Sequence, residues 1–161
     1  PSQYAKLAAG KQYAVYSAPS DTSFRAANGK ALLSTNDWVQ VFFEEDGYLL
    51  VQYAISRHQY RIWYVKADAV SNLSEVAEIG SWANYPAQVL RTSALTDDPL
   101  NSCGAVMTLT AGQQVTYLGQ LGQEWAFVET TTAQGQRIRG FVELSELNVT
   151  RPDDADDNLN G

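Results

Sequence analysis

The sequence is poor in the residues that most often perform catalysis or bind metal ions. Its 161 residues include one cysteine, Cys103, and one histidine, His58, which fall in different halves of the chain. A single cysteine excludes an intramolecular disulfide. A zinc site needs about four ligands, and a cysteine nucleophile needs a histidine held by a third polar group. We therefore expect no enzyme activity, no cofactor and no metal site.

Positive charge and long apolar runs are also scarce. Lys and Arg number 11 against 18 Asp and Glu, which gives a formal net charge of −7. No basic stripe is present, so nucleic acid and anionic membrane surfaces are excluded as expected partners. The wholly apolar runs are too short to span a bilayer, so we expect no membrane insertion.

Acidic residues are plentiful, but they fall at expected turns and near the end of the chain. They cluster at Glu44–Asp46, Asp97-Asp98 and Asp153–Asp157. A glycosidase needs two carboxylates across a cleft, one of them partly buried, whereas carboxylates at turns are ordinarily solvated. Weak calcium binding at Asp97-Asp98, or in the acidic tail, stays open as an alternative.

What the sequence does contain is an internal repeat. Shifted by 77 positions, Trp38–Val70 falls on Val115–Leu147 without a gap, and Tyr48 then lies on Trp125. The pattern of apolar positions agrees between the two halves better than the individual residues do. A repeat of this length is too long for a solenoid unit, so it predicts two copies of a small domain.

Short β-branched and aromatic segments, separated by Gly, Asn, Asp and Pro, predict strands in both halves. The clearest are Tyr48–Tyr53, Arg61–Val65, Val106–Leu109, Gln114–Leu118, Glu124–Thr130 and Arg137–Val142. No continuous helix of three turns is evident, so we expect an all-β fold. The expected organisation is a short helical lead-in over 1–12, a first domain over 13–76, an aromatic linker over 77–86, a second domain over 87–148 and a disordered acidic tail over 149–161.

Both halves share one order of short motifs. An apolar strand enters a polar loop, an aromatic-x-x-Val segment follows, and an aromatic-Val pair closes the half. In order, these are Val15–Pro19, Tyr48–Val51 and Tyr64-Val65 in the first half, and Val89–Ser93, Trp125–Val128 and Phe141-Val142 in the second. This order resembles the bacterial SH3-like domain, a small barrel of five or six strands, over about 13–70 and 87–148. The first half departs from it at Trp63, where the family usually has glycine.

The resemblance implies two small SH3-like barrels in tandem, packed through the aromatic linker. It also implies a bacterial protein that is exported or held in the cell envelope. Such domains bind peptidoglycan peptides or position a catalytic domain, and only the binding role carries over to a chain without a hydrolase domain.

The aromatic residues give the clearest indication of function. One aligned position is aromatic in both copies, as Tyr48 in the first and Trp125 in the second. We therefore expect both side chains to fill the barrel cores, and truncating Trp125 should unfold the second half. The first half has further aromatic residues at positions where the second half has none. These rings are more than a small barrel can bury, and exposed aromatic clusters mark binding surfaces. The expected groove consists of Tyr16, Phe43, Tyr53, Tyr60 and Trp63, with Arg61 meeting a carboxylate of the ligand.

Two functions remain open at this point. The first is a non-catalytic binding module that recognises a peptide or peptidoglycan fragment through this groove. The alternative is a structural or adaptor protein that docks a protein partner, or its own copy, through the same aromatic surface. In a third interpretation the surplus rings bury the contact between the two halves and the linker.

Overall fold

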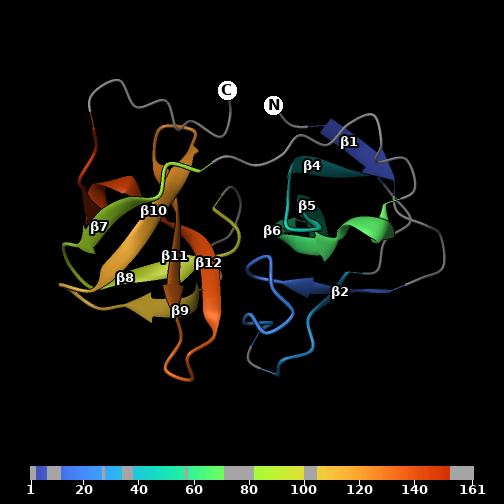
Figure 1. Cartoon of the computed structure of the whole chain (residues 1–161), viewed down its shortest axis with the longest axis horizontal. Helices are drawn as coiled ribbons and strands as arrows, with labels where there is room; N and C mark the ends of the chain where they lie inside the picture. The colour runs from blue at the N-terminus through green and yellow to red at the C-terminus, as the bar shows by residue number, and fades with distance from the viewer. Residues whose placement is uncertain are drawn as a thin grey trace. The chain divides into compact units, whose positions relative to one another are not determined.

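The computed structural model describes residues 3–6, 12–26, 28–33, 38–56, 58–70, 82–99 and 105–152. The chain divides into two compact units, unit 1 (Pro1–Gly80) and unit 2 (Ser81–Gly161). The described residues form strands and short 3₁₀ turns, arranged as two antiparallel sheets (Figure 1), which confirms the all-β class. None of the described segments is a helix long and apolar enough to cross a membrane.

Unit 1 contains a sheet of six strands. In chain order they are β1 (Gln3–Lys6), β2 (Tyr13–Tyr16), β3 (Leu32–Leu33), β4 (Trp38–Glu45), β5 (Tyr48–Ser56) and β6 (Gln59–Lys66). Across the sheet the order is β1-β4-β5-β6-β2-β3, and a 3₁₀ turn, η1 (Ala67–Ala69), follows β6. The turn between β4 and β5 is made by Asp46-Gly47, whose φ angles of 52° and 82° match the Asp-Gly signal in the sequence.

Unit 2 contains a sheet of seven strands. They are β7 (Tyr85–Val89), β8 (Ser93–Thr96), β9 (Ala105–Leu109), β10 (Gln114–Leu121), β11 (Trp125–Thr131), β12 (Arg137–Glu143) and β13 (Leu147–Val149). Their order across the sheet is β13-β7-β10-β11-β12-β8-β9, and a 3₁₀ turn, η3 (Leu144–Glu146), lies between β12 and β13. Strands β1, β4, β5, β6, β2 and β3 of unit 1 thus correspond to β7, β10, β11, β12, β8 and β9. Both sheets are open, because no ladder in the described ranges joins their edge strands.

The matching topology corrects the expected ends of the two copies. Residues 3–6 form β1, which pairs with β4, so the expected helix is wrong over this segment. Tyr85, placed in the linker by sequence, begins β7, the counterpart of β1. Strand β13 reaches Val149, which the sequence assigned to the tail, whereas residues 153–161 lie outside the described part of the chain.

Strand register also corrects the gapless repeat. The shift of 77 holds throughout the β5–β6 and β11–β12 ladders. In the preceding strand, Val41 pairs with Val51, whereas Tyr117 pairs with Val128, so the shift there is 76. A slip of one residue moves every side chain of a strand to the opposite face. The gapless alignment therefore compared residues from opposite faces of β4 and β10.

The extra residue lies in the turn after β10. Unit 2 spans it with Gly122–Glu124, and unit 1 with Asp46-Gly47 alone. Both strands carry a bulge at the same place, at Phe42 and at Leu118. Phe42 is therefore matched by an apolar residue and is not a surplus ring.

The opening strand of the second copy also lies at other residues than the sequence predicted. Tyr16 pairs with Tyr64, and Thr96 pairs with Phe141, which is 77 residues beyond Tyr64. The segment that matches Val15–Pro19 is therefore 95–99 and not 89–93. Two carboxylates that the sequence placed in solvent lie in this segment, and both are buried, with exposed fractions of 5% for Asp97 and 2% for Asp98.

Candidate functional site

The sheet divides the expected groove of unit 1 between its two faces. Tyr53 pairs with Arg61 across the β5–β6 ladder. Trp63 lies two residues from Arg61 along β6, so Tyr53, Arg61 and Trp63 share one face. The other three residues, Tyr16, Phe43 and Tyr60, lie on the opposite face, where their respective partners are Tyr64, Leu50 and Ala54. The six side chains therefore do not form one groove.

Two of the five rings, Trp63 and Tyr53, lie deepest in the core of unit 1. Trp63 is 1% exposed and Tyr53 is 3% exposed. Phe24 packs edge-on against Trp63 with ring centroids 6.3 Å apart, and the Arg61 guanidinium lies 4.5 Å from the Trp63 ring centroid. Arg61 also donates a hydrogen bond of 3.2 Å to the Tyr53 hydroxyl. The expectation that these two rings are exposed is wrong, so we remove them from the candidate site. Tyr16 is also buried, with 8% of its surface exposed, and ligand contact at Tyr16, Phe43, Tyr60 and Arg61 stays a prediction.

The face that carries Tyr16 is filled by residues of unit 1 itself. The Tyr16 ring packs edge-on against Tyr48, with centroids 5.5 Å apart, and the Arg25 guanidinium lies 5.0 Å from the Tyr16 centroid. The Tyr48 hydroxyl donates to the Asp21 carboxylate, which also pairs with Lys66 at 3.5 Å. We call this set of residues the Tyr16 cluster.

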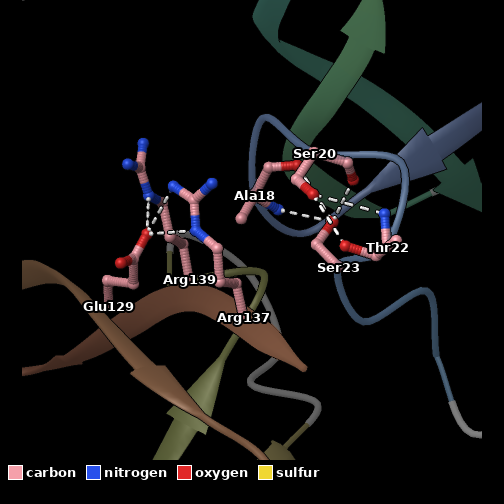
Figure 2. Close-up of polar contacts among 7 residues, drawn as sticks. All are labelled: Ala18, Ser20, Thr22, Ser23, Glu129, Arg137 and Arg139. Carbon is pink, nitrogen blue, oxygen red and sulfur yellow. Dashed lines mark hydrogen bonds and ion pairs between the residues drawn. The ribbon is translucent and has the colours of Figure 1, made fainter. Parts of the chain in front are cut away.

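The loop after β2 positions Asp21 for this cluster. The Ser23 hydroxyl donates to the backbone carbonyls of Ala18 at 3.0 Å and Ser20 at 2.8 Å (Figure 2). The Ser20 and Thr22 hydroxyls are 3.0 Å apart. These local bonds hold the turn in one conformation, as Ser and Thr side chains commonly do.

The matching place in unit 2 is open. A cleft of about 270 Å³ is lined by Thr92, Ser93, Ala94, Thr96, Trp125, Val142, Glu143 and Glu146. We call it the Trp125 cleft. Thr96 stands at the position of Tyr16, and its smaller side chain accounts for the space beside Trp125. Val142 is fully buried, whereas Trp125 is only half-buried, so the expectation that Trp125 fills the core is wrong.

The rim of the Trp125 cleft is acidic. Glu143 lies directly opposite Trp125 in the β11–β12 ladder. Its side chain is exposed and has no hydrogen-bond or ion-pair partner in the described part of the chain. Glu146 is held in place, because its Oε2 lies 2.6 Å from Arg91 Nε and accepts a hydrogen bond of 3.4 Å from the Ser93 hydroxyl.

A second hollow adjoins the same carboxylate. It has a volume of about 620 Å³ and is lined by Gln123, Glu124, Glu143, Leu144 and Ser145. The Leu144 N–H donates to the Glu124 carbonyl at 2.7 Å, which ties η3 to the turn before β11. Glu143 therefore lies between two hollows, with a second acidic residue, Glu124, on its far side.

The remaining charged cluster of unit 2 is internally paired. Glu129 Oε1 accepts hydrogen bonds from Arg139 Nε at 2.8 Å and Arg137 Nη2 at 2.9 Å (Figure 2). The Trp82 ring packs 5.3 Å from Phe127, measured between centroids, and faces the Arg139 guanidinium at 5.8 Å. Trp82, which the sequence placed in the linker, thus packs within unit 2. This cluster stabilises the sheet and leaves the Trp125 cleft as the candidate site.

The other sequence candidates contribute nothing to this site. His58 is exposed in the turn between β5 and β6, and Cys103 lies outside the described residues. Across the described ranges, no three His, Cys, Asp or Glu side chains are grouped so that they could hold a metal ion. The sequence did contain a signal for the Trp125 cleft: at the shift of 77, Lys66 falls on Glu143, a reversal of charge beside a shared aromatic position.

Neither a protein-family model nor a curated protein matches the sequence. Two solved structures, NlpC2 and NlpC1 from Trichomonas vaginalis, are similar to the chain, with 12% and 13% sequence identity and TM-scores of 0.36 and 0.37. The alignments cover 97% and 93% of this chain and 51% and 46% of those proteins. The chain thus spans about half the length of each NlpC structure.

Proposed function

We propose that this protein is a non-catalytic binding module that recognises a peptide through the Trp125 cleft. The observation that supports this proposal is a cleft of about 270 Å³ that is lined by the half-buried Trp125 and rimmed by Glu143, a carboxylate with no partner in the described part of the chain. Apolar walls with a few polar groups at the rim are typical of ligand sites. The proposal moves the binding surface from unit 1, where the sequence placed it, to unit 2.

The class of peptide is proposed from the motif order of the two halves. That order resembles the bacterial SH3-like domain, and the matching topology of the two units agrees with a tandem pair of one small domain. We therefore propose a cell-wall peptide as the ligand and an exported or envelope location for the protein.

A protein-docking role is the second candidate. Two apolar side chains near the β5–β6 turn of unit 1 are unusually exposed, at 43% for Ile55 and 37% for Tyr60. Exposed apolar side chains that lie together can mark a docking surface. This role would use unit 1, so one experiment can separate it from the first.

The test is co-sedimentation of the purified protein with insoluble bacterial peptidoglycan. We expect wild type to sediment and Trp125→Ala to stay in the supernatant. The matched control is a Phe43→Ala/Tyr60→Ala variant, which removes two rings from unit 1 and should sediment like wild type.

Circular dichroism spectra and melting curves establish that each variant is folded. Truncating the half-buried Trp125 should cost less than the ~3–5 kcal/mol typical of a fully buried aromatic ring. The proposal fails if wild type stays in the supernatant or if Trp125→Ala sediments unchanged. Loss of sedimentation in the control alone would return the site to unit 1.

A further inference from the structure

We propose that the Trp125 cleft selects a positively charged side chain of its peptide ligand, of the lysine type. This inference rests on the proposed function and adds the chemistry of the group that enters the cleft. It is carried by the pairing of Trp125 with Glu143, by the charge balance of the rim and by the comparison with unit 1.

The first argument is the geometry of the β11–β12 ladder. Trp125 and Glu143 are directly opposed residues of an antiparallel pair. The Cβ atoms of such residues lie about 4.5–5.5 Å apart and project from the same face of the sheet. One group can therefore contact the indole ring and the carboxylate together.

The second argument is charge. Glu146 is already paired with Arg91, but Glu143 has no partner in the described part of the chain. An anion in the cleft would meet two carboxylates, and an apolar group would gain no attraction from Glu143. A cation gains the attraction of Glu143 and of the electron-rich face of Trp125. The chain's net charge of −7 favours the same choice over longer distances.

The third argument is size and polarity along the cleft. A volume of about 270 Å³ lies just below the range of roughly 300–1,000 Å³ typical of small-molecule pockets, so the cleft suits a single side chain. Long basic side chains bury their alkyl stem on apolar surface and keep the charged end at the polar edge. The Trp125 ring and the Glu143 rim provide those two surroundings.

Unit 1 provides an internal contrast for this assignment. Its equivalent ladder position pairs Tyr48 with Lys66, so a cation stands where unit 2 has Glu143. Ala69 occupies the position of Glu146, and Tyr16 fills the space that Thr96 leaves open. The same place in unit 1 is therefore unsuited to a positively charged ligand.

The experiment is isothermal titration of the full chain with two synthetic peptides, acetyl-Gly-Lys-Gly-amide and the same peptide acetylated on the lysine Nε. Acetylation removes the positive charge and keeps the alkyl stem. We expect the acetylated peptide to bind about tenfold more weakly. Glu143→Gln should weaken binding of the lysine peptide by a similar factor, and the matched unit 1 variant Lys66→Gln should leave it unchanged.

The outcomes separate this inference from the proposed function. Equal binding of both peptides, lost in Trp125→Ala, would overturn the charge selection and keep peptide binding. Failure of both peptides to bind a protein that still sediments with peptidoglycan would also overturn the charge selection alone. Failure in both assays would overturn the two proposals together. Unchanged binding in Glu143→Gln would contradict the role given to that carboxylate.

Discussion

Each unit has an aromatic residue at the start of its central hairpin: Tyr48 begins the β5–β6 hairpin of unit 1, and Trp125 begins the β11–β12 hairpin of unit 2. Tyr16 covers the first ring, and the bond from Tyr48 to Asp21 holds it in place. Thr96 stands in the corresponding position of unit 2 and leaves a cleft beside the tryptophan. The comparison teaches that one position of a repeated fold can serve packing in one copy and line an open cleft in the other.

Three ladder positions further along the hairpin, the larger side chain is in unit 1 and the smaller one in unit 2. Trp63 occupies the place of Gly140, and β6 continues through it without interruption. In unit 2 a Cβ atom at Gly140 would lie 2.8 Å from Leu95 Cγ and 3.0 Å from the Thr96 carbonyl. Unit 1 has the smaller Val15 at the position of Leu95, and Phe24 from its loop packs on Trp63.

The largest effect is expected from Trp63→Ala. Removing a ring that is 1% exposed should lower the free energy of unfolding of unit 1 by about 3–5 kcal/mol. The control is Trp63→Phe, which keeps a ring and removes an indole N–H that has no hydrogen-bond partner among the described residues. Its cost should stay below about 1.5 kcal/mol. Urea denaturation of both variants measures the difference, and equal costs would contradict the core role of the ring.

An intermediate effect is expected from Gly140→Ala in unit 2. Because the new Cβ would meet Leu95 and a backbone carbonyl, overpacking should cost about 1–3 kcal/mol. Adding Leu95→Val, which copies Val15 of unit 1, should recover part of this loss. A double-mutant cycle measures the coupling. Strictly additive costs would show that the contact with Leu95 is not the cause.

The smallest effects are expected in the Tyr16 cluster. Tyr48→Phe removes the hydrogen bond to Asp21 and should cost about 0.5–1.5 kcal/mol. Lys66→Ala should cost less than about 1 kcal/mol, because the Lys66 and Asp21 side chains are 52% and 62% exposed. Thermal melts of the two variants give the ranking. A larger loss for Lys66→Ala would mean that the ion pair, and not the hydroxyl, holds the cluster.

Much of the fold was predictable because its signals are local. Alternating β-branched and aromatic residues located β5, β6 and β9 to β12 to within a few residues. Asp46-Gly47 formed the expected tight turn. Strand β1 was missed because Gln3–Lys6 has no marked alternation and forms a strand only by pairing with β4. Tyr85 was assigned to a linker for the same reason.

By itself, the sequence determined the all-β class and the presence of two related copies, because strand periodicity and turn residues act over a few neighbouring positions. Only the tertiary structure decided which rings are buried. One additional residue in the turn after β10 changes which residues of β4 and β10 correspond, and therefore which of them share a face of the sheet. Trp63, expected at the surface, is in the core, and Trp125, expected in the core, lines the cleft. Strand pairing and the cover supplied by distant loops set both outcomes, and neither can be read from a local pattern.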